Sequence, residues 1–198
     1  MNKIILASNN KHKITEFREI FSDCEILSLS DIGFFDEIEE NGTTFAENSL
    51  IKAKAVSVFI KNKGIVANII ADDSGLWVDA LNGEPGIFSA RYSESHNDKS
   101  NREKLLKNLE NKTNRKAYFC CTLVELFPDG KYLIAEGKTY GKITTQAIGD
   151  TSFGYDCLFF SNELNKTFGE ATCEEKNNVS HRKKAIEKLM ELRKKSLN

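Results

Sequence analysis

Apolar and polar positions follow one another along this chain in a pattern that predicts strands and helices in succession. Residues 4–7 form an unbroken apolar run, which is typical of a buried strand. Apolar side chains then recur at helical spacing between residues 13 and 21, and residues 24–29 indicate a second short strand. The polar stretch at 8–12 is therefore predicted to be a tight loop between a strand and a helix.

Two capping signals mark further helices. Thr44 and Glu47 fit a capping box at the start of a helix predicted over residues 44–61. Ser100 and Glu103 fit the same pattern before a leucine-rich segment. We therefore expect another helix to begin at Ser100.

The remaining apolar segments predict a mixed sheet. Residues 65–73 form an apolar run that ends in two aspartates, while 117–127 and 131–144 flank a Pro-Asp-Gly turn and predict a hairpin. Residues 185–192 carry the apolar spacing of a terminal amphipathic helix. Helices that interleave with strands, together with one long hairpin, indicate an α/β fold with a mixed sheet. We expect a single domain over residues 1–198, with two lobes that share the sheet.

Composition narrows the classes of protein. The 28 basic and 29 acidic residues nearly cancel, which gives no support to a nucleic-acid or membrane partner. The sequence shows no signal-peptide pattern, and no apolar stretch approaches the roughly 20 residues that span a bilayer. The five cysteines include no CxxC pair, so we interpret them as buried free thiols. A cytoplasmic protein that binds a small molecule is the resulting expectation.

The loop after the first strand is a candidate anion site. Ser8, Asn9 and Asn10 are small hydrogen-bonding residues at a helix N-terminus, and Lys13 adds a positive charge. The pattern lacks the glycines and the GK[ST] ending of a Walker A loop. A plain surface turn is the alternative, with His12 as a solvated loop residue.

Asp72 and Asp73 end a predicted buried strand, which is where open α/β sheets bind ligands. In an extended backbone they face opposite ways, so we expect only one to face the site. Such a carboxylate can hold Mg²⁺ or position a water, whereas an Asx-type turn before Gly75 is the alternative. Upstream, Glu39 and Glu40 belong to an acidic segment that could simply be solvated surface. If the fold brings this segment near Asp73, Glu40 becomes a natural second metal ligand.

Two later segments offer groups for a nucleotide base and its phosphates. Phe153 to Asp156 could stack on a base and hydrogen-bond its edge, or could form a core aromatic pair at a turn. Lys176, His181 and Arg182 gather at a predicted helix start, where Arg182 can donate to phosphate or to a base carbonyl. A solvated basic helix face is the alternative for this second group. Taken together, the candidates match what triphosphate hydrolysis needs.

This combination of motifs resembles the inosine triphosphate pyrophosphatase family, the house-cleaning dITP/XTP pyrophosphatases that act on non-standard purine nucleotides. The resemblance covers residues 4–192. Five segments match in the family's order: "LASNNKHK", "EENGTTFAENSLIKAKA", "ADDSGLWVDALNGEPGIFSARYS", "FGYDCLFF" and "EEKNNVSHRKKA".

The resemblance implies a fold, an activity and partners. It implies an elongated mixed sheet with flanking helices and two lobes around a cleft. It implies hydrolysis of ITP, dITP and XTP, in preference to ATP and GTP, to the monophosphate and pyrophosphate, which prevents their incorporation into nucleic acid. Mg²⁺ as cofactor and a homodimer are implied as well.

The resemblance also implies roles for particular residues. Asp73 matches the family's catalytic carboxylate, which acts as proton acceptor and Mg²⁺ ligand. Glu40 matches the acidic metal-binding position, with Glu39 as the less favoured neighbour. Ser74 follows as a substrate contact. The other implied substrate-binding residues are Ser8, Asn9, Asn10, Lys11, His12 and Lys13 in the triphosphate loop, Phe153, Gly154, Tyr155 and Asp156 in the base loop, and Lys176, His181 and Arg182 as distal contacts.

The chain departs from the family pattern at two places. Cys157 stands where the family usually has a proline, and proline would fix φ there. The first loop reads Ser8-Asn9-Asn10 where T-G-N is common.

Two other functions stay open, a non-catalytic nucleotide sensor and a pyrophosphatase for dUTP or modified pyrimidines.

Overall fold

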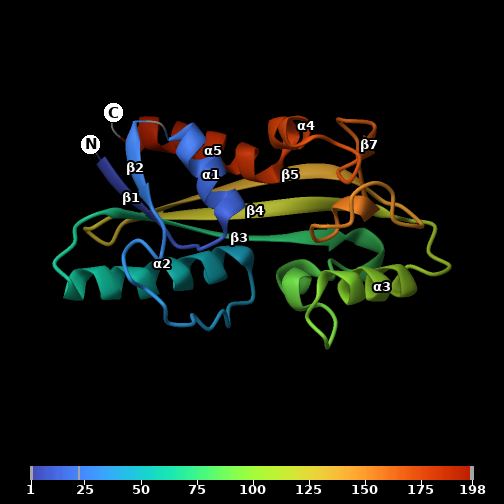
Figure 1. The fold of residues 1–198 in the computed structure, drawn as a ribbon, viewed down its shortest axis with the longest axis horizontal. Helices are drawn as coiled ribbons and strands as arrows, with labels where there is room; N and C mark the ends of the chain where they lie inside the picture. The colour runs from blue at the N-terminus through green and yellow to red at the C-terminus, as the bar shows by residue number, and fades with distance from the viewer. Residues whose placement is uncertain (1, 22, 197–198) are drawn as a thin grey trace. The chain divides into compact units, whose positions relative to one another are not determined.

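The computed structural model describes residues 2–21 and 23–196 (Figure 1). The strands are β1 Asn2–Leu6, β2 Cys24–Leu27, β3 Asn68–Val78, β4 Lys116–Leu126, β5 Tyr132–Ile143, β6 Phe159–Ser161 and β7 Lys166–Thr167. The helices are α1 Lys11–Ile20, α2 Phe45–Asn62, α3 Asp98–Asn108, α4 Cys173–Val179 and α5 His181–Ser196, with 3-10 turns at Asp79–Leu81, Gly86–Arg91 and Asp156–Leu158.

The described strands form a mixed sheet in the order β2-β1-β3-β4-β5-β6-β7. β1 runs parallel to both β2 and β3, whereas β6 is antiparallel to β5 and to β7. Between β4 and β5 the Phe127 N–H donates to the Lys131 carbonyl at 2.9 Å, and the Gly130 N–H donates to the Phe127 carbonyl at 3.0 Å. The α/β class, the mixed sheet and the hairpin are therefore confirmed.

The chain forms two compact units. Unit 1 comprises Met1–Asp73, Thr122–Ala135 and Leu189–Asn198, and unit 2 comprises Ser74–Cys121 and Glu136–Lys188.

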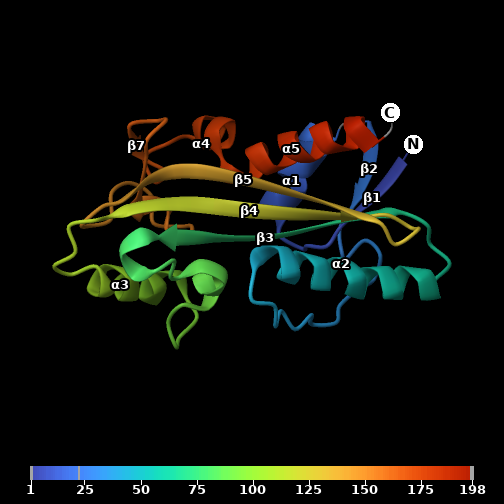
Figure 2. The ribbon, with the colours of Figure 1, turned by 180° about the vertical axis from the view of Figure 1, so that it is seen from behind.

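In unit 1 the helices α1 and α2 lie on opposite faces of the sheet (Figures 1 and 2). α2 buries one apolar face, including Ala53, Val56 and Ile60, in a cluster that also contains Ile5 and Ile69. Because β1 and β3 are covered on both faces in this unit, residues 4–6 of β1 and 69–71 of β3 are apolar in succession.

The last turn of α5 is fixed to unit 1 by a buried ion pair. Glu125 on β4 is fully buried, and Arg193 Nε donates to its Oε2 at 2.5 Å while Nη2 donates to Oε1. Asn68 Nδ2 donates to the same Oε1 at 2.8 Å, and the guanidinium lies 5.0 Å from the Phe21 ring centroid. The buried carboxylate thus has a bidentate cationic partner and a further donor.

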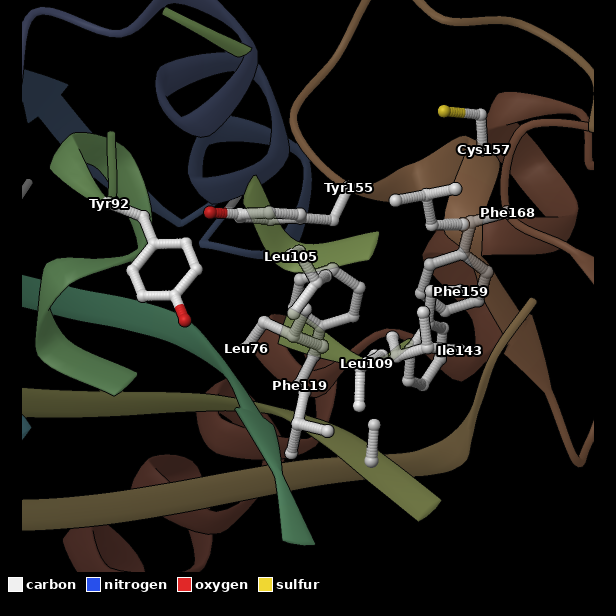
Figure 3. Close-up of a cluster of buried hydrophobic side chains, with 13 residues drawn as sticks. Leu76, Tyr92, Leu105, Leu109, Phe119, Ile143, Tyr155, Cys157, Phe159 and Phe168 are labelled. Atoms are coloured by element: carbon white, nitrogen blue, oxygen red, sulfur yellow. The ribbon is translucent and has the colours of Figure 1, made fainter. Parts of the chain in front are cut away.

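Unit 2 has its own aromatic core (Figure 3). Leu105 of α3 and Leu109, the C-cap of that helix, pack with Phe119 on β4 and Phe159 on β6. Cys157 is fully buried in this cluster, so its thiol serves as a core residue.

Helix starts follow the sequence prediction only in part. The Glu47 N–H donates to Thr44 Oγ1 at 3.1 Å as expected, but the Glu47 carboxylate accepts from the Thr43 N–H at 2.6 Å and so closes the box one residue earlier. The expectation that a helix begins at Ser100 is wrong. Asn97 is the N-cap of α3 and accepts from the Ser100 N–H at 3.0 Å, because asparagine is at least as good a cap as serine and places Asp98 in the first turn.

The cysteines are free thiols, as predicted. Cys120, Cys121 and Cys157 are buried and Cys24 is half-buried, but Cys173 is exposed because it begins the surface helix α4. The prediction of burial is therefore wrong for Cys173. Within the described ranges, every helix is too short or too polar to cross a membrane.

Candidate active site

In unit 1 the loop between β1 and α1 is built by its own polar side chains. Asn10 caps α1, because its Oδ1 accepts from the Lys13 N–H at 3.3 Å and its carbonyl accepts from the Ile14 N–H at 3.0 Å. Ser8 Oγ accepts from the Asn10 N–H at 3.1 Å, and Asn9 Oδ1 accepts from the Ser30 N–H at 2.8 Å. These bonds fix the course of the loop.

Two predicted loop residues remain. The Lys11 side chain is exposed, and the His12 side chain lies outside the part of the chain that the structure describes.

Lys13 on α1 neutralises a buried carboxylate. Its Nζ lies 2.9 Å from Asp72 Oδ1 and 2.7 Å from Oδ2, and Asp72 is only 1% exposed. A carboxylate at that depth needs a charged partner, since its desolvation penalty would otherwise be several kcal/mol. Lys13 therefore stands at the loop, as predicted, but as one half of an ion pair.

Asp73 contacts the other face, that of α2. Asn48 Nδ2 donates to Asp73 Oδ2 at 3.0 Å, and Lys52 Nζ lies 4.0 Å from Asp73 Oδ1 and 3.1 Å from Glu40 Oε2. Burial raises the pKa of Asp73, and the charges of Glu40 and Asp72 raise it further, while Lys52 and Asn48 oppose the shift. The expectation that the two aspartates face opposite ways is confirmed, since they contact helices on opposite faces of the sheet (Figure 1).

A pocket of about 280 Å³ lies beside these groups in unit 1, and of the two adjacent aspartates Asp72, not Asp73, is among its lining residues. Three carboxylates and two ammonium groups lie in its wall. The lining residues are Ala7, Ser8, Lys13, Leu29, Asp36, Ile38, Glu40, Lys52 and Asp72. The ammonium groups of this wall suit the phosphates of a small polar ligand, and the carboxylates suit the cations that accompany such phosphates.

The carboxylates of this region bear on whether a metal ion could be held here. In residues 2–21 and 23–196, no group of three or more His, Cys, Asp or Glu side chains is placed to hold a metal. Mg²⁺, however, often takes only one or two protein carboxylates and completes its shell with water and substrate phosphates. Glu40 and Asp73 fit that smaller requirement, because both already face one cation, the Lys52 ammonium. Glu40 lines the pocket, whereas Glu39 is exposed.

Unit 2 gathers the residues predicted to bind the base. The Phe153 ring is 49% exposed, and the Lys176 ammonium lies 4.8 Å from its centroid. Lys176 also donates to Asp156, which is buried. Burial raises the pKa of Asp156, and the charges of Lys176 and Arg182 oppose that shift. An exposed aromatic ring beside cationic groups is the arrangement expected of a base platform.

The backbone of the aromatic loop is held by α3. Arg102 Nη1 donates to the Gly154 carbonyl at 2.7 Å, and the Gly154 N–H donates to Asp98 Oδ2 at 2.8 Å. Gly154 has φ of +47°, a left-handed conformation that glycine adopts readily. Tyr155 instead points into the core, where its hydroxyl donates to the Ser89 carbonyl at 2.8 Å (Figure 3).

His181 begins α5 and is mostly buried. Its ring stacks on Phe119 with centroids 5.1 Å apart and an interplanar angle of 16°. Ser74, the residue after Asp73, is half-buried at the start of unit 2.

The structure thus divides the predicted residues into two groups, each within one unit. The group in unit 1 is Ser8, Asn9, Asn10, Lys11, His12, Lys13, Glu40 and Asp73, and the group in unit 2 is Ser74, Phe153, Gly154, Tyr155, Asp156, Lys176, His181 and Arg182. Sequence reasoning missed the residues that hold these groups: Asn48, Lys52, Asp98 and Arg102.

The Lys176–Asp156 pair leads to a prediction about stability and pH. We expect Lys176→Met to lower the free energy of unfolding by about 1–3 kcal/mol near pH 7, because a buried carboxylate loses its partner. The raised pKa of Asp156 means that the folded protein binds this proton more tightly than the unfolded chain, so the group's contribution is greatest at low pH and is lost as the pH rises. The difference in free energy of unfolding between the wild type and Lys176→Met, the deficit of the variant, should therefore become smaller on acidification.

Urea denaturation at pH 7.5 and at pH 5 measures that deficit. Lys166→Met is the matched control, because Lys166 pairs with Glu175 and both side chains are about a third or more exposed. Its effect should be small at both pH values. Equal effects of the two variants, or a deficit for Lys176→Met that grows on acidification, would contradict this account.

The fold and the pocket define an α/β protein with a site for a small, charged ligand. The chain belongs to the Ham1 family, whose model matches residues 4–192. It is 50% identical over 195 residues to the dITP/XTP pyrophosphatase of Clostridium perfringens (strain 13 / Type A), covering 96% of each chain. It is 46% identical over 194 residues to the dITP/XTP pyrophosphatase of Listeria innocua serovar 6a, covering 96% of this chain and 93% of that one.

Solved structures agree with this family membership. The structure of the Staphylococcus aureus Ham1 protein is 40% identical in sequence and superimposes with a TM-score of 0.88, covering 98% of this chain and 100% of that one. The family predicted from the sequence motifs is thereby confirmed.

Proposed function

We propose that this protein hydrolyses the non-standard purine nucleotides dITP, ITP and XTP to the monophosphate and pyrophosphate, and so keeps them out of nucleic acid. The observation that carries the proposal is the grouping of Asp73, Glu40 and Lys52 in unit 1, next to the strand-to-helix loop. The near full-length similarity to proteins named dITP/XTP pyrophosphatase supports it.

The unit 1 pocket, together with Asp73 beside it, would supply the groups for attack on a phosphoanhydride. Asp73 would orient the attacking water and accept its proton. The loop from Ser8 to Lys13 would seat the phosphates, and Lys52 would offset negative charge that develops in the transition state. Glu40 and Asp73 would hold Mg²⁺, which would supply charge neutralisation at the reacting phosphorus.

The residues of unit 2 would select the base. Phe153 offers a ring face for a purine, and Lys176 together with Asp156 lies beside it. His181 and Arg182 would donate to a 6-keto oxygen. A 6-amino group, as in adenine, would meet these donors with another donor and leave them unpaired.

A substrate panel with product analysis tests the proposed function. With Mg²⁺ present, dITP, ITP and XTP should each give the monophosphate and pyrophosphate. The value of kcat/KM for ATP should be lower by about 10- to 100-fold, which corresponds to the 1–3 kcal/mol of an unpaired buried donor. EDTA should abolish turnover.

Other outcomes would overturn the proposal. Orthophosphate as the primary product would exclude a pyrophosphatase. A preference for dUTP would indicate a pyrimidine enzyme, and binding of dITP without turnover would indicate a nucleotide sensor. The homodimer and the cytoplasmic location remain predictions from the sequence.

A further inference from the structure

A fully buried amide on α2 joins Asp73 to the segment that follows Glu40. Asn48, in the first turn of the helix, is 0% exposed. Its Nδ2 donates to Asp73 Oδ2 at 3.0 Å, and its Oδ1 accepts from the Gly42 N–H at 2.9 Å. We propose that Asn48 is a positioning residue that determines which oxygen of Asp73 faces the reaction. The catalytic role of Asp73 in this inference rests on the proposed function.

The two oxygens of Asp73 have different neighbours. Oδ2 is bound by Asn48, whereas Oδ1 lies toward Lys52, whose ammonium also contacts Glu40. Asn48 and Lys52 are four residues apart and so lie on the same face of α2. One helix face thus binds one oxygen of the carboxylate with a neutral donor and directs the other toward the charged groups of the pocket.

The second hydrogen bond of Asn48 fixes the segment that carries Glu40. Gly42 follows Glu40 by two residues and lies against the start of α2. A Cβ on Gly42 would be 2.7 Å from Asn48 Oδ1 and 2.7 Å from Glu47 Cβ, so the approach requires glycine. Asn48 therefore sets Asp73 and the Glu40 segment relative to each other.

An asparagine meets both requirements without adding charge. The amide supplies one donor for a carboxylate and one acceptor for a backbone N–H. An aspartate at this position would keep the bond from Gly42 but would present a second negative charge to Asp73. An alanine would leave both Gly42 and Asp73 without this partner in a buried site. The two substitutions therefore separate the two bonds.

Kinetics of the variants test the inference. For Asn48→Asp and Asn48→Ala we expect kcat with dITP to fall by about 10- to 100-fold, the usual effect of removing a partner that orients a reactive ligand, with KM little changed. Asn101 provides the matched control, because it is 1% exposed, also lies in the first turns of a helix, and bonds the Ser93 N–H at 2.7 Å and the Ala90 carbonyl at 3.1 Å. Asn101→Ala should lower the melting temperature comparably and leave kcat unchanged.

A second measurement needs no turnover. By NMR hydrogen exchange, the Gly42 amide should stay protected in Asn48→Asp, which keeps the acceptor, and lose protection in Asn48→Ala. In crystals of Asn48→Asp, the Asp73 carboxylate should leave the orientation that it has in the wild type.

The outcomes separate this inference from the proposed function. An inactive wild-type protein would refute the proposed function. Hydrogen exchange and crystallography would still show whether Asn48 holds Gly42 and Asp73 as inferred. An active wild type with unchanged kcat in Asn48→Asp would overturn the inference. A loss of kcat in Asn101→Ala that equals the loss in Asn48→Ala would overturn it too.

Discussion

Asp73→Asn is expected to lower kcat for dITP by about 100- to 10,000-fold, the range that a positioned general base contributes. Asparagine keeps the shape of the side chain and an oxygen that can accept from Asn48, but it cannot take a proton. Burial disfavours the charged form of Asp73, as its raised pKa indicates, so the neutral amide should leave the protein at least as stable. Steady-state kinetics and a thermal melt measure the two effects.

The opposite changes in activity and stability separate a catalytic role from a structural one. Glu40→Gln and Glu39→Gln form a matched pair, because Glu40 contacts Lys52 at the pocket and Glu39 is exposed. Activity should fall in the first and persist in the second. If Asp73→Asn retained wild-type turnover, or lost it only together with its folded structure, Asp73 would not be the base.

The largest effect on stability is expected from Arg193→Ala. Removing one partner of a buried ion pair lowers the free energy of unfolding by about 3–5 kcal/mol, because the remaining charge is left in the interior. Glu125 is fully buried and would retain its bond from Asn68. Arg193→Lys should rescue little, since an ammonium cannot reproduce the bidentate contact. Urea denaturation at neutral pH measures each difference.

A double variant distinguishes the ion pair from mere packing. Glu125→Met combined with Arg193→Met removes both charges and keeps the volume, so its stability should be close to that of the wild type. Lys184→Ala is the control, because Lys184 and Glu163 form an ion pair that is about a third or more exposed on each side. A double variant as unstable as Arg193→Ala would show that shape, rather than charge, is what matters here.

The sequence predicted those features that depend on local periodicity. Apolar spacing located β1, α1, α2 and the hairpin, since each element must bury one face whatever its partners are. The opposite orientation of Asp72 and Asp73 followed from the two-residue repeat of a strand. The start of α3 was misplaced, because Asn97 and Ser100 are both good caps and only tertiary context selects one.

The residues that hold the site could not be predicted, because their partners are distant in sequence. Lys52 belongs to an ordinary stretch of α2 and becomes notable only when the fold brings it to Glu40 and Asp73. Arg102 reaches Gly154 across 52 positions of the chain. Tyr155 belongs to a motif that was expected to face a base. Its burial depends on the unit 2 core, to which distant segments of the chain contribute.

The contacts of α3 with the aromatic loop have a consequence for how this protein can change. Asp98 and Arg102 bind the N–H and the carbonyl of Gly154, and these two bonds depend on the course of the chain and not on the identity of its side chains. The position before Gly154 can therefore accept new residues while the loop keeps its path. Evolution can vary the group presented to a ligand at residue 153 without rebuilding the support beneath it.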